Sequence, residues 1–274
     1  MAHVDAGLAT SDRAELPKLR SQTIDRAALI LTCFSTEDPH LSLAKIASRL
    51  GVNQSSVYRY VATLQAAGLL ERDERRGGYR LGLRIVELAS IVLNHIPVRR
   101  EAIPEMDRLR EETGLLINLA VRDGGDVVHI AHSAPQGWPV WVTTPGRRAV
   151  AHCTALGKAL LAHTPWQEVQ AVIADQGWRP YTEKSIQSFD RLESELAEVQ
   201  RRGYAIDDGE RGDDSICVGA PIRDHAGQVI AAMSVSGTAR RAGPRLHEEL
   251  VPGIVEVASR TSIRLGYSGA LGFE

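Results

Sequence analysis

Residues 41–70, LSLAKIASRLGVNQSSVYRYVATLQAAGLL, constrain the fold of this chain more than any other stretch. Apolar residues recur there at helical spacing, which predicts two short helices that each bury one face. Ser42 precedes the first helix as a candidate N-cap, and Gly51 follows it where a left-handed backbone is accessible. Asn53 is placed to cap the second helix. Two short helices around a glycine turn are typical of the DNA-binding helix-turn-helix.

The outward face of the predicted second helix carries polar side chains that suit DNA. These side chains are Gln54, Ser55, Tyr58 and Arg59. Arginine recognises guanine through two hydrogen bonds, glutamine recognises adenine, and serine contacts a base or a phosphate. No Asp or Glu occurs between residues 39 and 70, which favours a surface that faces phosphates. An ordinary helical hairpin with a polar outer face is the alternative.

A β-hairpin is predicted directly after the second helix. Residues 69–72 and 79–81 are its strands, and Arg75-Arg76-Gly77-Gly78 is its turn. This hairpin indicates the wing of a winged helix-turn-helix, with two arginines at the tip to contact the DNA backbone or a flanking groove. The predicted domain spans residues 21–82, and its candidate DNA contacts are Arg26, Lys45, Asn53, Gln54, Ser55, Ser56, Tyr58, Arg59, Arg75, Arg76 and Tyr79.

Composition fits a globular protein with two domains. The chain has 274 residues, of which 43% are hydrophobic and 24% charged. No secretory signal is apparent, and no apolar run approaches the about 18 residues of a membrane span. The three scattered cysteines, Cys33, Cys153 and Cys217, indicate a reducing compartment, so we expect a cytoplasmic protein without a membrane partner.

Charge is distributed unevenly along the chain. Residues 21–80 contain eight basic and six acidic residues, a net charge of +2, which leaves −4 for the remainder of a chain whose net charge is −2. A basic head on an acidic body fits local DNA contact with a separate function behind it. Residues 1–20 lack periodicity and are expected to form a mobile arm.

Residues 83–113 are expected to form linker helices, one ending at Asn94 and a second running from Val98 to about residue 112. The first carries an apolar stripe that a small winged domain cannot cover. A second copy of the chain is the expected partner, giving a two-fold dimer with heads spaced for a palindromic site. The alternative is that the stripe packs on the chain's own body.

Residues 114–274 are expected to form an α+β domain, an antiparallel sheet with flanking helices. Alternation of apolar and polar residues predicts strands, and the 3.6-residue period predicts helices. The predicted strands span residues 115–122, 126–134, 204–207, 216–222 and 229–236, with a further extended piece at 138–142; the predicted helices span residues 154–163, 165–174, 189–202 and 246–265. Residues 147–153 are predicted to be a loop.

The order of these motifs resembles the IclR family of bacterial transcription regulators from about residue 21 to residue 267. The matching segments are LAKIASRLGVNQSSVYRYVATLQAAGLLERD, YRLGLRIVELA, HCTALGKALLA, RRGYAIDDGER, CVGAPIRD and GQVIAAMSVSG. The resemblance implies an N-terminal winged helix-turn-helix, a linker helix and a C-terminal GAF-like domain that binds a small molecule, usually an organic acid. It also implies assembly as a homodimer or a dimer of dimers.

The resemblance further implies an effector pocket, with an apolar wall formed by Trp138 and Trp141. Its other residues are Ala155, Leu156, Asp207, Cys217, Ser234 and Ser236. The chemistry is reasonable, because N–H groups at the start of the helix after residue 154 would attract a carboxylate. Ser234 and Ser236 alternate with Val235, so both hydroxyls face one side of a strand.

The two tryptophans replace the aliphatic residues expected in members that bind very small keto acids. Tryptophan favours stacking on a flat ring, so an aromatic acid is the expected effector. Keto acids, sugar acids and aliphatic diacids remain alternatives, as does a purely structural role for Trp138 and Trp141.

Two other classes of function have weaker support in the sequence. Four potential metal ligands could converge, namely His152, Cys153, Asp207 and Cys217, but no pair has a tight local spacing. Neither a nucleophile motif nor a phosphate-binding glycine loop is present. We therefore expect no cofactor, no metal and no catalytic residue, and interpret the chain as an effector-responsive regulator, such as a repressor, of double-stranded operator DNA. A metal-responsive DNA-binding protein is a lesser alternative, and an architectural DNA binder with a vestigial body is another.

Overall fold

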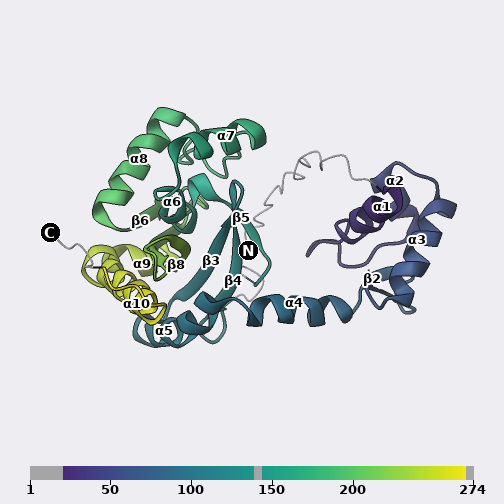
Figure 1. Ribbon diagram of the computed structural model, residues 1–274, viewed down its shortest axis with the longest axis horizontal. Coiled ribbons are helices and arrows are strands. Elements are labelled where there is room, and N and C mark those ends of the chain that lie inside the picture. The colour runs from purple at the N-terminus through teal and green to yellow at the C-terminus, as the bar shows by residue number, and fades with distance from the viewer. Residues whose placement is uncertain (1–20, 139–143, 270–274) are drawn as a thin grey trace. The chain divides into compact units, whose positions relative to one another are not determined.

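The computed structural model describes residues 21–138 and 144–269, and the chain divides into two compact units, residues 1–93 and 94–274 (Figure 1). Trp141, the predicted arm at residues 1–20 and most of the predicted extended piece lie outside the described residues. No helix among the described residues is long and apolar enough to cross a membrane.

The N-terminal unit is a winged helix-turn-helix. Its elements are α1 (Gln22–Leu31), α2 (Leu43–Leu50), α3 (Gln54–Ala66), β1 (Leu70–Arg72), β2 (Tyr79–Leu81) and most of α4 (Arg84–Asn94). The predicted caps are confirmed: the Ser42 side chain accepts a hydrogen bond from the Lys45 N–H, and the Asn53 side chain accepts one from the Ser56 N–H. Gly51 ends α2 in the left-handed conformation, with φ of 65°.

The wing is fastened to the segment that precedes α2. Leu41 and Tyr79 exchange two backbone hydrogen bonds of 2.9 and 2.8 Å. Gly78 makes this approach possible, because a Cβ at this position would lie 2.7 Å from the Leu41 carbonyl oxygen. The Tyr79 side chain therefore points inward and joins the core of the head with Ile30, Ile46 and Val57.

The C-terminal unit is built on one six-stranded antiparallel sheet. The strand order is β5-β4-β3-β8-β7-β6. Its strands are β3 (Leu116–Asp123), β4 (Asp126–Ser133), β5 (Arg148–Val150), β6 (Ala205–Asp208), β7 (Ser215–Arg223) and β8 (Val229–Thr238). The prediction of a loop over residues 147–153 is wrong, because Arg148 begins an edge strand that pairs with β4. The Arg148 side chain pairs with Asp126 of β4 and with Asp123 of β3.

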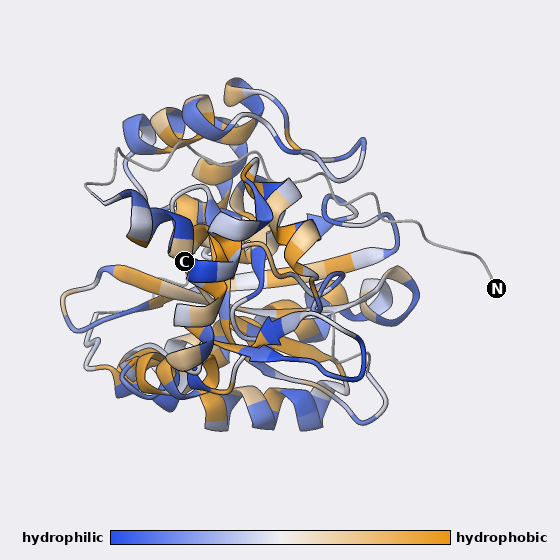
Figure 2. Ribbon diagram, turned by 90° about the vertical axis from the view of Figure 1, so that its right-hand side faces the viewer, coloured by the Kyte–Doolittle hydropathy of each residue, from blue (hydrophilic) through white to orange (hydrophobic). Residues whose placement is uncertain are grey.

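Helices cover both faces of this sheet (Figure 1). α5 (Pro97–Thr113) and α10 (Val251–Arg264) pack on one face, and α6 (Ala155–Leu161), α7 (Trp166–Gln176) and α8 (Phe189–Arg202) lie on the other. Hydrophobic and hydrophilic residues both occur along single helices, as expected for helices that bury one side (Figure 2). The predicted fold class is confirmed.

Two helical segments differ from the prediction. α5 packs on β3, β4 and α10, so it is part of the C-terminal unit rather than of a linker. A single helix was predicted over residues 246–265, but its first five residues form a π turn (Leu246–Leu250) before α10. α9 (Ala239–Ala242) and a 3₁₀ turn (Gly243–Arg245), which were not predicted, come before it. Pro244 and Pro252 lack the N–H that a continuous helix through this region would use.

A buried carboxylate joins the two helices on the first face. Glu105 of α5 is buried, and its oxygens lie 3.4 Å from Arg108, 3.3 Å from Arg260 and 3.0 Å from Arg264. Arg260 and Arg264 belong to α10. The single carboxylate thus compensates arginines from both helices.

Replacing Glu105 by Gln should lower the free energy of unfolding of the C-terminal unit by about 3 kcal/mol, because it leaves clustered arginines without their common partner. Urea unfolding followed by tryptophan fluorescence measures this unit selectively, since all four tryptophans lie between residues 138 and 178. The matched control is Glu112→Gln, an exposed partner of Arg108, which should change stability by less than about 0.5 kcal/mol. Equal losses in the two variants would contradict the assigned role of Glu105.

Candidate DNA-binding and effector sites

The outward face of α3 is exposed as the sequence predicts. Gln54, Ser55, Tyr58 and Arg59 are all exposed, and 60% of Tyr58 is accessible although it is a large aromatic side chain. The Arg59 guanidinium lies 6.0 Å from the centre of the Tyr60 ring. Because Tyr58 and Arg59 are both exposed on this helix, their side chains can reach phosphates and base edges.

The cations of α2 are less available than the sequence suggests. Asp38, one residue outside the acid-free run, pairs with Lys45 at 2.7 Å and with Arg49. The hydrogen bond from Lys45 and, to a smaller extent, the one from Arg49 hold the pKa of Asp38 below its usual value. Lys45 is therefore a neutralised cation in this structure and a weaker candidate for a phosphate contact than was predicted.

Positive charge is concentrated instead on α3 and the wing. Within residues 21–138 and 144–269, five arginines of the head make no ion pair, namely Arg26, Arg59, Arg72, Arg75 and Arg76, and all of them except Arg26 belong to α3 or the wing. The Asp73 carboxylate accepts the backbone N–H groups of Arg75 and Arg76, both at 3.1 Å, so it shapes the turn and leaves both side chains exposed.

Three other predicted DNA contacts have structural roles. Tyr79 is a correction, because its side chain is buried in the core and is not available to DNA. Arg26 donates a hydrogen bond to the Tyr60 hydroxyl at 3.2 Å. Asn53 accepts from the Ser56 N–H and from the Ser55 hydroxyl, both at 2.9 Å, so it orders the start of α3 while staying exposed.

The predicted effector residues of the sheet share one face. Pairing aligns Asp207, Cys217 and Ser236 in one row across β6, β7 and β8, and aligns Gly219 with Ser234 in the next. Residues opposite one another in register point to the same side. The prediction that Ser234 and Ser236 face one side is therefore confirmed. Both rows lie on the face that α6 covers, because Gly219 meets the Ala155 backbone.

The same face carries three polar residues that the sequence analysis missed. Asn118 of β3 pairs with Ser234 on one side and with His132 of β4 on the other, and its amide donates to the Ser236 hydroxyl at 3.3 Å. His129 joins them because the β3–β4 register shifts after Leu119. We call the set Asn118, His129, His132, Ser234, Ser236, Cys217 and Asp207 the polar floor.

The start of α6 is closed by the protein itself. A Cβ at Gly219 would lie 2.7 Å from the Ala155 carbonyl carbon, so α6 rests directly on the backbone of β7. The Thr154 hydroxyl accepts the Gly157 N–H at 3.1 Å. Ala155 and Leu156 are buried. The expectation of open N–H groups is therefore wrong for Gly157.

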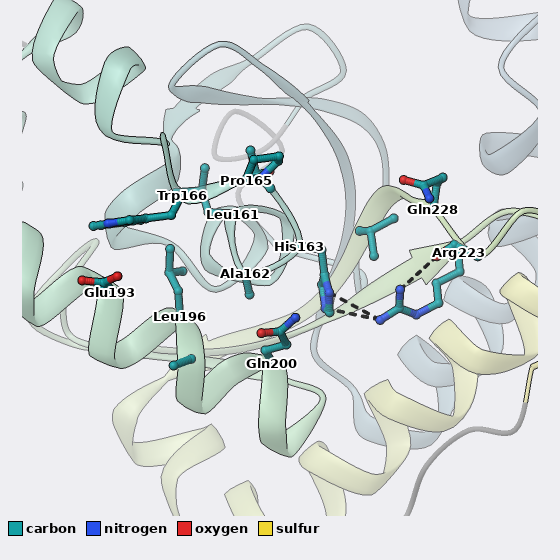
Figure 3. Close-up of a pocket in the computed structure, with 14 residues that line it drawn as sticks. Leu161, Ala162, His163, Pro165, Trp166, Glu193, Leu196, Gln200, Arg223 and Gln228 are labelled. Carbon is teal, nitrogen blue, oxygen red and sulfur yellow. Dashed lines mark hydrogen bonds between the residues drawn. The ribbon is translucent and has the colours of Figure 1, made fainter. Parts of the chain in front are cut away.

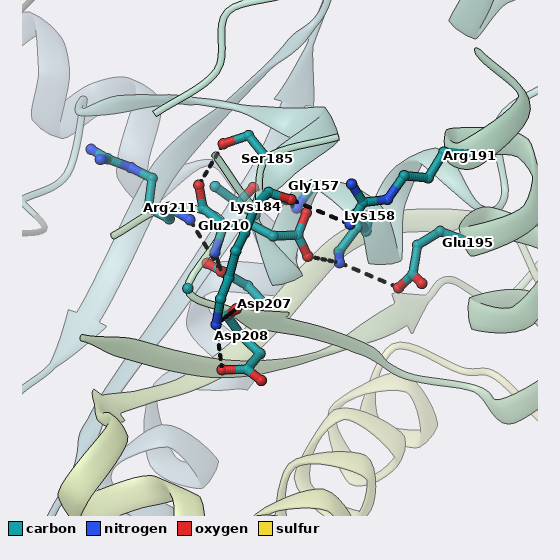
Figure 4. Close-up of polar contacts among 12 residues, drawn as sticks. Gly157, Lys158, Lys184, Ser185, Arg191, Glu195, Asp207, Asp208, Glu210 and Arg211 are labelled. Carbon is teal, nitrogen blue, oxygen red and sulfur yellow. Dashed lines mark hydrogen bonds and ion pairs between the residues drawn. The ribbon is translucent and has the colours of Figure 1, made fainter. Parts of the chain in front are cut away.

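A buried ion pair sets the geometry around α6. Lys158 points into the interior, where it pairs with Glu210 and lies 3.3 Å from Glu195 of α8 (Figure 4). Burial raises the pKa of Glu210, and the Lys158 ammonium acts against this shift. The pair fixes the turn that follows β6.

Asp207 caps that turn and directs Arg211. Its Oδ1 atom accepts the Glu210 N–H at 2.8 Å and the Arg211 N–H at 3.1 Å. Burial raises the pKa of Asp207 to about 6 despite these hydrogen bonds. The Arg211 guanidinium lies 3.8 Å from the centre of the Tyr181 ring and makes no ion pair within the described residues.

Other predicted side chains do not meet on the polar floor. Trp138 is half-buried, with the Arg241 guanidinium 5.7 Å from its ring. His152 packs edge-on against Trp178 at 5.0 Å. Burial lowers the pKa of His152 to about 4 and raises that of Cys153 to about 12. Within the described residues, no three His, Cys, Asp or Glu side chains form a group that could hold a metal ion.

Two surface cavities of this unit lie elsewhere. One of about 510 Å³ opens between α6, α8 and the β7–β8 turn, where His163 lies against Arg223 (Figure 3). The other, of about 600 Å³, lies along α8 beside Glu195 and Glu210. Neither is lined by a residue of the polar floor.

Asp207 should make the C-terminal unit less stable as pH rises. Its folded pKa of about 6 exceeds the unfolded value, so its contribution is most favourable below pH 4 and is lost between pH 4 and 6. Asp207→Asn keeps an Oδ1 acceptor for both N–H groups and removes the buried charge. At pH 7.5 the variant should be more stable than the parent by on the order of 2 kcal/mol, and the difference should vanish near pH 4. Urea unfolding at both pH values measures this, with the exposed neighbour substitution Asp208→Asn as control. A variant less stable at pH 7.5 would contradict this account.

Comparison with known proteins agrees with both units. Residues 23–74 match the model of the IclR helix-turn-helix domain, and residues 90–263 match that of the bacterial transcriptional regulator IclR C-terminal domain. The HTH-type transcriptional regulator XynR of Escherichia coli is 31% identical over 215 residues, which cover 78% of this chain and 85% of that protein.

Solved structures share the fold. Thermotoga maritima IclR superposes with a TM-score of 0.72 at 29% identity, covering 89% of this chain and 99% of that one. An IclR homologue from Microbacterium hydrocarbonoxydans, crystallised with 4-hydroxybenzoate, gives a TM-score of 0.77 at 24% identity, covering 89% and 98%. Since the C-terminal model alone matches more than half of the sequence, this chain belongs to the IclR family of bacterial transcriptional regulators and is a DNA-binding regulator.

Proposed function

We propose that the chain binds operator DNA through α3 and the wing, and that a small carboxylate bound on the polar floor modulates this binding. The observation that carries the proposal is the contrast between two surfaces. α3 and the wing expose arginines without ion pairs, whereas the sheet buries hydroxyl, amide and imidazole groups on one face. Buried polar groups require partners, and a polar ligand supplies them.

The proposed site on DNA combines base and phosphate contacts. Gln54, Ser55 and Arg59 read base edges in the major groove, while Tyr58 and Ser56 contact the adjacent backbone. Arg75 and Arg76 of the wing add phosphate contacts.

We propose a homodimer, or a dimer of dimers, joined in part through α4. Leu83, Val86 and Val92 are 72%, 63% and 62% exposed, and no residue of α4 is buried. Contiguous exposed apolar side chains on a helix indicate an interface, and a second copy of α4 offers the same stripe. A two-fold dimer presents two recognition helices to a palindromic operator.

The effector proposal follows from the chemistry of the sheet face. Ser234, Ser236 and Cys217 lie together and can donate to one carboxylate. Half-buried Trp138 is the remaining described support for the predicted aromatic acid. The hydrophilic floor supports the keto and sugar acid alternatives. Whichever acid binds, its affinity must differ between two states of the dimer that have different arrangements of the heads. A ligand with equal affinity for both states does not change their populations.

We propose that the chain has no catalytic role and that it acts on DNA in the cytoplasm. The one sequence pair that resembles a nucleophile and base is Cys153 with His152. A thiol whose pKa is about 12 remains protonated at neutral pH, and the His152 ring packs edge-on against Trp178.

Arg59→Ala should weaken operator binding by about 1–3 kcal/mol while affecting random DNA less, because a bidentate base contact is lost. Fluorescence anisotropy with operator and scrambled duplexes at fixed salt measures both affinities. Arg75→Ala is the matched control and should weaken binding to the two duplexes equally, as expected for a phosphate contact. Equal losses for Arg59→Ala as well would show that Arg59 does not read bases.

Ser234→Ala combined with Ser236→Ala should leave operator affinity unchanged and abolish the response of DNA binding to the effector. The reason is that the variant loses two hydroxyl donors on the polar floor and nothing in the head. The same anisotropy titration with and without effector measures this. Ser133→Ala is the control, because Ser133 pairs with Ile117 and faces the opposite side of the sheet. A double variant that keeps a full response would place the effector elsewhere.

A further inference from the structure

The irregular pairing of β3 with β4 places two histidines on one face. Along a regular strand, residues 129 and 132 would point to opposite sides. The register shift after Leu119 pairs Ala120 with His129 and Asn118 with His132, leaving Ile130 as the extra residue. Because Asn118 and Ala120 share a face, His129 and His132 share it too.

Several groups of the polar floor have no hydrogen-bond partner within the protein. The Oδ1 atom of Asn118 and the Nδ1 atoms of His129 and His132 are buried and unpartnered in the described part of the chain. Asn118, His129 and Ser234 are themselves more than nine-tenths buried. A buried polar atom left without a partner destabilises a protein by about 1–3 kcal/mol, so three on one face point to a ligand.

Cationic groups face this set from the neighbouring loops. Burial lowers the pKa of His129 to about 4, and the nearby charges of Arg147, Arg211 and His132 act in the same direction. Arg211 also lies close enough to Cys217 of β7 to oppose the rise in the pKa of that thiol. The Arg211 backbone N–H is bound to Asp207 of this face at 3.1 Å, and its guanidinium lies 3.8 Å from the centre of the Tyr181 ring. Asp207 is the acidic group on the same face, and its Oδ1 atom is occupied by two backbone N–H groups.

We propose that the polar floor selects a hydroxyl-bearing aliphatic carboxylate, with His129 and His132 as specificity-determining residues. This inference rests on the proposed effector site and names the class of its ligand. The carboxylate binds beneath Arg211 beside His129, and the hydroxyl groups pair with Asn118, His132, Ser234 and Ser236. The span from β4 to β8 is two strand spacings, roughly 10 Å, which accommodates a chain of a few carbons.

The same geometry disfavours a plain aromatic acid. An unsubstituted ring would cover the Asn118 amide and the His132 imidazole without offering either a hydrogen bond. Sites built to bind a hydroxyl reject analogues without it far more strongly than apolar pockets reject an extra methylene. Trp138 then packs with the Arg241 guanidinium, 5.7 Å from its ring centre, rather than stacking on the effector.

The test compares acids that differ only in their hydroxyl groups. Thermal unfolding of the full-length chain, followed by tryptophan fluorescence, is measured with glycerate and gluconate, with propionate and hexanoate as their deoxy counterparts, and with benzoate. A ligand that binds only the folded state raises Tm. We expect at least one hydroxylated acid to raise Tm in a concentration-dependent way, and its deoxy counterpart of equal length to have at least tenfold weaker affinity.

The histidines are tested separately. His129→Gln and His132→Gln should each weaken binding of the hydroxylated acid at least tenfold. His163→Gln should not, because that partly buried histidine lies beside Arg223 in the cavity of Figure 3. The Tm of each variant without ligand shows whether it is folded, and the comparison of acids on the unaltered chain does not depend on any variant.

The outcomes separate the two proposals. Stabilisation by benzoate, with none by a hydroxylated acid, overturns the ligand class and leaves the carboxylate sensor standing. Equal effects of an acid and its deoxy counterpart, or unchanged binding in both folded histidine variants, also overturn this inference. If none of the carboxylates raises Tm, both this inference and the proposed effector function are overturned.

Discussion

The C-terminal unit depends on a contact between two backbones. α6 rests on β7 without an intervening side chain, because position 219 is glycine, and its first turn meets Ala151, where a Cβ at Gly157 would lie 2.1 Å from the carbonyl oxygen. All seven residues of this helix are buried as a result. Lys158 is therefore forced into the interior and requires Glu210, which fixes the turn capped by Asp207. Arg211 follows Glu210 in that turn and is bound through its N–H to Asp207, so a steric constraint at two glycines helps to hold a cationic residue next to the polar floor.

The cations of the head fall into two groups, those paired with a carboxylate and those without an ion pair. Asp38 neutralises Lys45 and Arg49 on α2, whereas α3 and the wing keep arginines without ion pairs within the described residues. DNA affinity therefore depends on fewer cations than composition suggests, and those that remain lie on the reading helix and at the hairpin tip. A modest number of phosphate contacts favours regulation, because a small change in the spacing of the heads then alters affinity measurably.

Much of this organisation was predictable because it follows from local rules. The caps at Ser42 and Asn53, the bounds of α8 and the common face of Ser234 and Ser236 need only the residues within a few positions. The rest depends on contacts that periodicity does not encode. The bulge that turns His129 to the same face as His132 depends on pairing with β3. Asp38, which pairs with Arg49 of α2, lies outside the acid-free run. Tyr79 points inward because Leu41 pairs with the wing.

The central claim is that the polar face of the sheet, rather than a surface cavity, binds the effector. The most direct measurement is the position of a stabilising acid in a crystal structure of the full-length chain. The account predicts electron density beneath Arg211, in hydrogen-bond contact with Ser234, Asn118 and His132. Density in the cavity between Trp166 and Arg223, with the polar floor filled by protein side chains, would contradict it.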